Sequence, residues 1–217
     1  MLEFSLLCLQ RLDLEGEMKK IHNHLDSIHL DIMDGEFVPP TAFSTNFVDD
    51  YKTSLKKHVH VMSYRPEEFF DELNNITSFS FHIEALKNPK PLLEKIRSQN
   101  IQPGLVVSPQ TNIEKVFQYL ELVDRIILMA VDPGYSAQSF IPETSKKIIK
   151  LRKQDKNVEI VIDGGMNEDT MREVLSLGAN ECVVCSVIVK SDNPIEKIKS
   201  LKSSGKIGLQ NNEFLNN

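Results

Sequence analysis

The segment EIVIDGGMNEDTMREVLSLGANECVVC, residues 159–185, contains one complete strand–helix–strand unit. The runs EIVI and ECVVC at its ends are short, apolar and β-branched, as buried strands are, and the stretch 168–177 has the apolar spacing of a helix. Asn167 directly precedes that stretch, in the position of an N-cap, and acidic residues occupy the first turn after it. Gly178 directly follows the stretch, where a glycine often ends a helix. The segment therefore predicts two parallel strands joined by a helix.

The same alternation continues along the rest of the chain. Apolar runs lie at 4–8, 28–32, 58–62, 79–83, 104–107, 125–131, 159–162 and 181–185. Helical stretches lie at 66–73, 89–99, 112–120, 142–153 and 168–177. Eight strands that alternate with helices predict either a closed barrel or a doubly wound open sheet. No G-x-G-x-x-G follows the first strand, so we predict an α/β fold of the (β/α)₈ TIM-barrel type.

Length and composition favour one domain. A chain of 217 residues lies near the lower end for a single α/β barrel, and 41% hydrophobic residues are enough to fill its core. No linker or low-complexity tract interrupts the pattern. We predict one barrel domain over residues 1–202, with a helix beginning near Asp192, and a polar, asparagine-rich tail over residues 203–217 that is partly disordered.

Charge and hydropathy exclude several classes of function. The formal net charge is −6 and no basic run offsets it, so nucleic acid is not expected as a partner. No apolar stretch approaches the roughly 20 residues that span a bilayer, so we expect no membrane span. The N-terminal residues lack a basic segment followed by a long apolar one, so we expect no signal peptide. A cytoplasmic protein is expected. An anionic substrate stays possible, because helix N-termini bind phosphate without lysine.

The cysteines do not indicate a disulfide framework. The chain contains three of them, Cys8, Cys182 and Cys185. The C-x-x-C formed by the last two suggests a redox or zinc site, but residues three apart in a strand point to opposite faces. A reduced protein is therefore the simplest expectation.

Chemically capable side chains collect where predicted strands end, and active sites of such barrels lie at those ends. His29 and Asp31 share one face of the second strand, His60 lies in the third, and Asp163 ends the seventh. Two histidines and two carboxylates suit a divalent metal. Alternatively, the histidines bond to backbone groups and Asp31 caps a turn. Asp163 is harder to explain in that way, because an acid after four apolar residues is costly unless something binds it.

Two loops suggest a phosphate site. The stretch DPGYSAQ at 132–138 follows the sixth strand, and Gly164-Gly165 follows the seventh. Ser186 comes after the eighth strand. Barrels of this type often hold a phosphate after strands seven and eight, where small residues let backbone N–H groups approach an anion.

Several motifs, taken in order and spacing, resemble the ribulose-phosphate 3-epimerase family from Ser5 to about Lys190. They are His29-Leu30-Asp31-Ile32-Met33-Asp34-Gly35 with Phe37-Val38-Pro39, His60-Val61-Met62, His82-Ile83-Glu84, Asp132-Pro133-Gly134, Gln138-Ser139-Phe140 and Ile162-Asp163-Gly164-Gly165. The resemblance implies a barrel of the ribulose-phosphate binding type. It also implies metal-dependent 3-epimerisation of a phosphorylated ketose, D-ribulose 5-phosphate to D-xylulose 5-phosphate.

The resemblance also assigns roles. It places the metal ligands at His29, Asp31, His60 and Asp163, for Zn²⁺, Mn²⁺, Fe²⁺ or Co²⁺. Asp31 and Asp163 double as acid and base on opposite faces of C3. Residues expected to contact substrate at the reacting end are Ser5, Met33, His60, Met62 and Met129, and those expected around the phosphate are Gly134, Gly164, Gly165 and Ser186. A homo-oligomer is common in this family.

Departures from the family pattern leave alternatives open. Cys185 stands where a glycine is usual beside Ser186, and Ser136-Ala137 replace glycines, which bears on phosphate affinity. His58 stands at a position that is normally aspartate.

Other residues resemble the allulose-6-phosphate 3-epimerase branch, namely Cys8, Ser44 and Asn167. A non-catalytic sugar-phosphate-binding barrel is a second alternative. Orotidine-phosphate decarboxylase chemistry, which occurs on a related phosphate-binding barrel, requires an Asp-x-Lys-x-x-Asp motif. This sequence does not contain that motif, so we do not expect that reaction.

Overall fold

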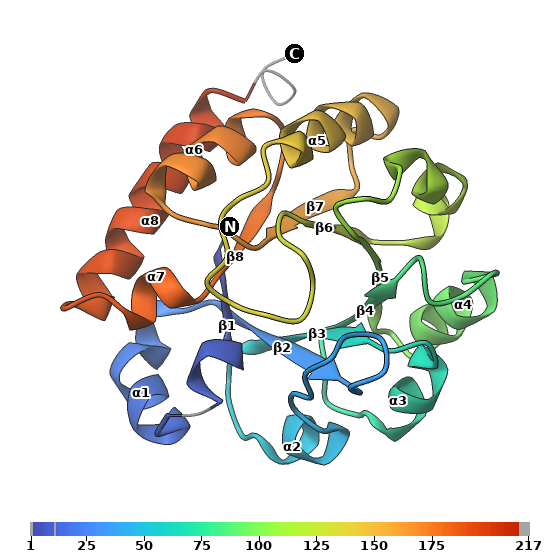
Figure 1. The fold of residues 1–217 in the computed structure, drawn as a ribbon, viewed down its shortest axis with the longest axis horizontal. Helices are drawn as coiled ribbons and strands as arrows, with labels where there is room; N and C mark the ends of the chain where they lie inside the picture. Colours follow the sequence, from blue (N-terminus) through green and yellow to red (C-terminus); the bar gives the residue numbers. More distant parts are fainter. Residues whose placement is uncertain (1, 11, 213–217) are drawn as a thin grey trace.

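Eight parallel strands close into a barrel in the computed structural model, which describes residues 2–10 and 12–212 (Figure 1). Each strand pairs with its neighbours in chain order, and the first pairs with the last. The strands are β1 Leu2–Ser5, β2 Ser27–Met33, β3 Lys56–Met62, β4 Ser78–His82, β5 Gln102–Val107, β6 Arg125–Met129, β7 Glu159–Asp163 and β8 Glu181–Val184. The predicted (β/α)₈ barrel is confirmed.

Helices surround the barrel on its outer side (Figure 1). They are α1 Leu14–Ile21, α2 Thr45–Asp50, α3 Pro66–Glu72, α4 Lys90–Ser98, α5 Glu143–Gln154, α6 Glu168–Ser176, α7 Ser186–Val189 and α8 Pro194–Gln210, with 3₁₀ helices η1 Leu6–Leu9, η2 His22–His24 and η3 Ile113–Leu122. The helix expected at 112–120 is therefore a 3₁₀ helix. No helix within the described residues is both long enough and apolar enough to cross a bilayer.

The first strand ends earlier than its apolar run suggested. The run at 4–8 predicted one strand, but β1 stops at Ser5 and the chain turns into η1. The Ser5 hydroxyl accepts a hydrogen bond from the N–H of Leu7 at 3.2 Å, which caps this turn. The cap places Ser5 at the rim of the barrel.

The C-terminal helix extends past the boundary that the composition suggested. The polar tail was predicted to begin at 203, but α8 continues to Gln210. Its last turns pack on α6, where a Cβ at Gly208 would lie 2.6 Å from the carbonyl oxygen of Arg172. Tertiary packing thus orders residues that local composition does not. The part of the predicted tail at 213–217 lies outside the described residues.

The barrel interior is divided into an apolar and a polar half. A cluster from β5 to β8 and the loop after β6 fills one half, and it consists of Val106, Ile127, Met129, Val131, Val161 and Val183. On the side of β1 to β4 most of the buried inward residues are polar, and they include Ser5, His29, Asp31, His60, Ser80 and His82. Barrel interiors of this type are usually filled by branched apolar residues. A polar half is costly unless its groups are paired or bind a ligand.

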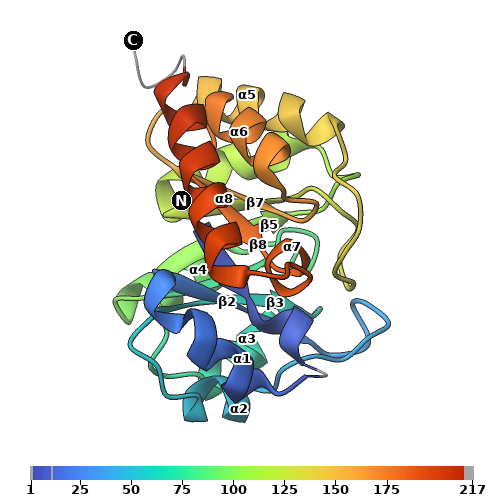
Figure 2. The same cartoon turned by 90° about the vertical axis from the view of Figure 1, so that its left-hand side faces the viewer.

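Strand register sets the relative positions of these polar residues. β2 and β3 pair along seven residues each, and Asp31 lies beside His60 as Met33 lies beside Met62. Leu30 and Ile32 alternate with them and pack against the helices. The loops that follow β2 and β6 leave the barrel on the same side (Figure 2). They touch there, since a Cβ at Gly134 would lie 3.2 Å from Val38.

Candidate active site

Four side chains from three strands converge at the C-terminal end of the barrel. They are His29 and Asp31 of β2, His60 of β3 and Asp163 of β7, and one ligand atom of each lies within 4.8 Å of the others. Asp31 Oδ1 lies 3.5 Å from His29 Nε2 and 3.3 Å from His60 Nδ1. Asp163 Oδ2 lies 3.5 and 3.7 Å from the same two nitrogens. Each carboxylate thus faces both histidines.

The same two nitrogens have no hydrogen-bond partner, although both are buried. A buried polar nitrogen without a partner is unfavourable, and a metal ion would satisfy both at once. Imidazole nitrogens and carboxylate oxygens are ligands for zinc and other divalent transition metals. The residues therefore fit a divalent metal site.

Glu3 holds His29 in the required tautomer. Both side chains are completely buried, and His29 Nδ1 lies 2.9 Å from Glu3 Oε2. A carboxylate can only accept, so Nδ1 carries the proton and Nε2 presents its lone pair to the four-residue cluster. The charge of Glu3 is paired in turn with Arg125, which is also completely buried.

A second relay orients His60. Its Nε2 lies 3.0 Å from His82 Nε2, and His82 Nδ1 lies 3.2 Å from Glu84 Oε2. If His60 Nδ1 is to bind a metal, its Nε2–H must donate to His82, whose Nδ1–H then donates to Glu84. Burial lowers the pKa of His82 to about 4, so this ring is neutral near pH 7. The relay fixes the tautomer of both rings.

Charges within the cluster favour an ionised Asp31. Burial by itself raises the pKa of Asp31, but His29 and then His60 outweigh it and hold that pKa far below its usual range. In the same way burial disfavours the charged form of His29, yet the charge of Asp31 raises the pKa of His29 well above its ordinary value. The carboxylates thus attract positive charge, which a divalent cation supplies.

Glu84 makes the stability of the barrel depend on pH. Burial raises its pKa, but the hydrogen bonds with His82 and Thr111 lower the pKa to about 2 from an ordinary 4.5. Because the folded pKa is the lower one, the stabilisation is present above pH 4.5 and is lost as pH falls towards 2. We expect Glu84→Gln to cost about 1–2 kcal/mol at pH 6 and much less near pH 3. Urea unfolding of both proteins measures the difference, and a gap that stays constant with pH would contradict this assignment.

A cavity of about 370 Å³ opens above the cluster, within the range of small-molecule sites. The predicted site residues that line it are Ser5, Asp31, Met33, Met62, Met129, Gly134, Asp163, Gly164, Gly165 and Ser186. The predicted residues His29 and His60 do not line it, because both are completely buried. Ser5 donates a hydrogen bond from its hydroxyl to Asp31 at 2.8 Å and so orients this carboxylate at the cavity floor.

The glycine pair after β7 has the geometry that a close approach requires. Gly164 and Gly165 have φ of +106° and +70°, which favour glycine. A Cβ at Gly165 would lie 2.5 Å from the backbone nitrogen of Phe140, in the loop that follows β6. No side chain fits at this position, so the glycine allows the loops after β6 and β7, which both line the cavity, to pack closely together.

Gly165→Ala is expected to impair both folding and binding. The left-handed backbone and the contact with Phe140 should lower the free energy of unfolding by about 1–3 kcal/mol, measured in urea. Displacement of the loop should raise KM for a phosphorylated substrate more than it lowers kcat. Gly178→Ala is the matched control, because Gly178 has a φ of +115° but lies at the far end of α6. An unchanged KM in Gly165→Ala would remove this loop from the binding site.

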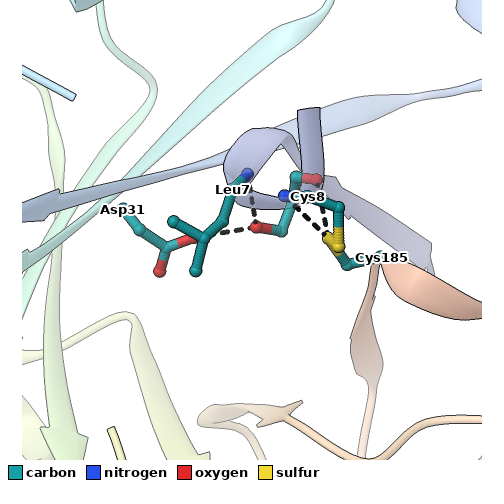
Figure 3. The surroundings of a disulfide bond; sticks show 5 residues. Leu7, Cys8, Asp31 and Cys185 are labelled. Carbon is teal, nitrogen blue, oxygen red and sulfur yellow. Dashed lines mark hydrogen bonds between the residues drawn. A yellow bond between two sulfur atoms is a disulfide. The ribbon is translucent and has the colours of Figure 1, made fainter. Parts of the chain in front are cut away.

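The cysteines depart from the sequence-based expectation. A reduced chain was expected, but Cys8 of η1 and Cys185, which directly follows β8, form a disulfide (Figure 3). Their Cα atoms lie 5.9 Å apart, although 177 positions separate them in sequence. Barrel closure between β1 and β8 brings them together. Cys182 is the buried free cysteine among the described residues, so Cys185 is paired with Cys8 and not with its C-x-x-C neighbour.

Some residues of the site were not assigned a role from sequence. Glu3 carried a signal that could have found it, because a carboxylate in an apolar strand two residues before Ser5 faces the barrel interior. His82 and Glu84 were quoted within a motif, but their link to His60 depends on the pairing of β3 with β4. The disulfide had no local signal.

Known proteins support the barrel and its family. The model of the ribulose-phosphate 3 epimerase family matches residues 1–189. A ribulose-phosphate 3-epimerase of Methanocaldococcus jannaschii is 32% identical over 209 residues, which are 93% of this chain and 89% of that protein. The enzyme named ribulose-phosphate 3-epimerase, cytoplasmic isoform, of Oryza sativa subsp. japonica is 33% identical over 187 residues, or 82% of each chain.

Solved structures extend the likeness of the fold. Orotidine 5′-monophosphate decarboxylase from Sulfolobus solfataricus superposes with a TM-score of 0.68 at 13% identity, over 96% of this chain and 98% of that one. At this identity the likeness concerns the fold alone. The family model matches most of the chain, and the chain covers 82% and 89% of these two relatives at 33% and 32% identity. The chain therefore belongs to the ribulose-phosphate 3-epimerase family.

Proposed function

We propose that this isomerase interconverts D-ribulose 5-phosphate and D-xylulose 5-phosphate by inverting C3 with the help of a divalent metal. The observation that carries the proposal is the meeting of Asp31 and Asp163 at two buried, unpartnered histidine nitrogens below the cavity. The relatives named ribulose-phosphate 3-epimerase support the choice of substrate. We infer a cytoplasmic location, which the name of the rice isoform supports.

His29, Asp31, His60 and Asp163 would hold the metal. Bound there, it supplies Lewis-acid stabilisation of the negative charge that develops on the substrate oxygens. Glu3 keeps the Nδ1 proton of His29 away from the ligand position, and the relay through His82 does the same for His60. Metal binding would then displace a proton only from the nitrogen of each ring that faces the cluster, while the other ring proton stays in its bond to Glu3 or His82.

The two carboxylates have complementary positions for inversion. Asp31 extends from β2 and Asp163 from β7, with β8 and β1 between them in the barrel. One carboxylate takes the proton from C3, the C3–H bonding pair becomes the second bond between C2 and C3, and the π pair of the C2 carbonyl moves onto its oxygen. The other carboxyl group then delivers a proton to the opposite face of C3. One group must be ionised while the other is protonated, so the two act as a pair.

Apolar side chains would shield the reacting carbon. Met33, Met62 and Met129 line the cavity beside the carboxylates, and each is almost completely buried. They limit the access of water to a carbanion-like intermediate. The phosphate would lie near Gly165 and Ser186, which also line the cavity, since small residues let backbone N–H groups approach an anion.

The main alternative substrate is D-allulose 6-phosphate. Two of the residues that suggested it act as helix caps, because Ser44 accepts the N–H of Phe47 and Asn167 accepts those of Asp169 and Thr170. The cap explains Ser44 without reference to substrate, whereas Asn167 also lines the cavity. Ribulose 5-phosphate stays the primary proposal because the relatives support it.

Proton exchange in D₂O, followed by NMR, tests the proposal. The metal-free protein is incubated with ribulose 5-phosphate or allulose 6-phosphate, alone and with added Mn²⁺, Zn²⁺ or Co²⁺. Deuterium at C3 together with the C3 epimer of ribulose 5-phosphate is the expected result. Exchange with allulose 6-phosphate but not with ribulose 5-phosphate would identify allulose 6-phosphate as the substrate. If the metal is bound and neither compound exchanges its C3 proton, the protein is a non-catalytic sugar-phosphate-binding barrel.

A further inference from the structure

The disulfide joins two elements that both border the active site. η1 begins directly after Ser5, whose hydroxyl is bonded to Asp31. Cys185 lines the cavity and precedes Ser186 at the expected phosphate end. The bond therefore links the segment that orients a proton carrier to the segment that faces the phosphate (Figure 3).

The surroundings of Cys185 suit both oxidation states. Its sulfur accepts the backbone N–H of Cys8 at 3.1 Å, an interaction available to a disulfide as well as to a thiol. It also lies 3.3 Å from the carbonyl oxygen of Ser5, to which a Cys185 thiol can donate. The Cys185 sulfur therefore has a polar contact in either state.

Accessibility separates this pair from the third cysteine. Cys8 and Cys185 are both partly exposed, and Cys185 lines the cavity, so a small thiol or disulfide can reach the pair. Cys182 is completely buried, and burial raises the pKa of its thiol well above the ordinary value. Since the thiolate is the reactive form, exchange is restricted to the exposed pair.

We propose that Cys8 and Cys185 form a reversible thiol–disulfide switch that controls the affinity of the site for the phosphorylated substrate. The oxidant is a low-molecular-weight disulfide. One cysteine thiolate attacks it and releases the first small thiol, and the second cysteine attacks the resulting mixed disulfide and releases the second. The pair loses two electrons and two protons, and the small disulfide becomes two thiols.

The oxidised state is the one with the ordered cavity. The bond holds the Cys185 side chain against η1 and fixes the turn in front of Ser186. Reduction frees that side chain and loosens both segments, so binding must then order them. We expect KM to rise about three- to tenfold on reduction, while kcat changes less, because Asp31 and Asp163 extend from β2 and β7, which the disulfide does not join. In a reducing cytoplasm such a bond is transient, as expected of a sensor.

The test uses the full chain loaded with Zn²⁺, which has no redox chemistry of its own. The protein is equilibrated in buffers of increasing glutathione disulfide, and thiols are alkylated under denaturing conditions and mapped by mass spectrometry. We expect oxidation of Cys8 and Cys185 together with Cys182 left free. KM is measured in both states, with a phosphine as the reductant because it adds no thiol that would compete for zinc or form a mixed disulfide.

Variants separate the switch from a general effect of oxidation. Cys8→Ser and Cys185→Ser should show the high KM in every buffer, whereas Cys182→Ala should respond as the wild type does. A pair that never oxidises would overturn the proposal, as would a KM that is the same in both states or a shift that persists in Cys8→Ser. Thiol mapping needs no turnover, so loss of the proposed epimerase activity would be recognised separately.

Discussion

Asp163→Asn is expected to slow epimerisation about a thousandfold while the barrel stays folded. Asparagine has the same shape but cannot carry a proton between the substrate and solvent. Asp163 is partly exposed at the cavity floor, with 15% of its side chain accessible, so the substitution removes no fully buried ion pair. The rate measured with saturating metal and the circular dichroism spectrum check the two parts of this expectation.

Isotope exchange makes the prediction sharper. The variant retains Asp31, which can still remove and return a proton on its own face of C3. One epimer should therefore take up deuterium from D₂O without inverting, and the other should not exchange. Asp169→Asn is the matched control, since it makes the same change on a carboxylate that is 90% exposed. Epimerisation above about a tenth of the wild-type rate with metal bound would remove Asp163 from the mechanism.

Glu3→Gln should lower the affinity for a divalent metal about 10- to 100-fold, although Glu3 is not a ligand. An amide can donate as well as accept, so it no longer fixes the Nδ1 proton of His29. A ring in the other tautomer carries its proton at the ligand position. Titration with Co²⁺, followed by its visible absorption, measures both the affinity and the geometry of the bound ion.

Loss of stability must be separated from this effect, because Glu3→Gln also leaves Arg125 without its closest partner. Arg125→Met removes the guanidinium and keeps the bond between Glu3 and His29. It should cost stability but leave metal affinity near that of the wild type. The double variant should recover stability and retain the weak binding. A metal affinity that follows stability through the three variants would contradict a positioning role for Glu3.

Local pattern was sufficient to predict the elements that carry the four ligands. His29, Asp31 and His60 lie in strands with a clear period of two, and Asp163 ends an apolar run before two glycines, so their position at one end of the barrel followed from the sequence. The extent of β1 did not follow, because the cap at Ser5 ends the strand within a continuous apolar run.

Contacts between distant segments could not be predicted in the same way. The pairing of Glu3 with Arg125 joins positions 122 apart. The disulfide joins Cys8 to Cys185 only because β8 closes on β1. The end of α8 depends on the packing of Gly208 against α6, where no side chain fits. Each contact is a property of the closed barrel, and the sequence contains no local record of it.

Barrel closure also sets the moment at which the site is completed during synthesis. Three of the four ligand residues leave the ribosome early, with β2 and β3, but Asp163 arrives with β7 and β1 gains its second neighbour only with β8. A nascent chain that has reached β6 has open strand edges and an incomplete ligand set. The four expected ligands are therefore complete only once β7 has emerged, and the barrel that holds them in place closes one strand later, with β8.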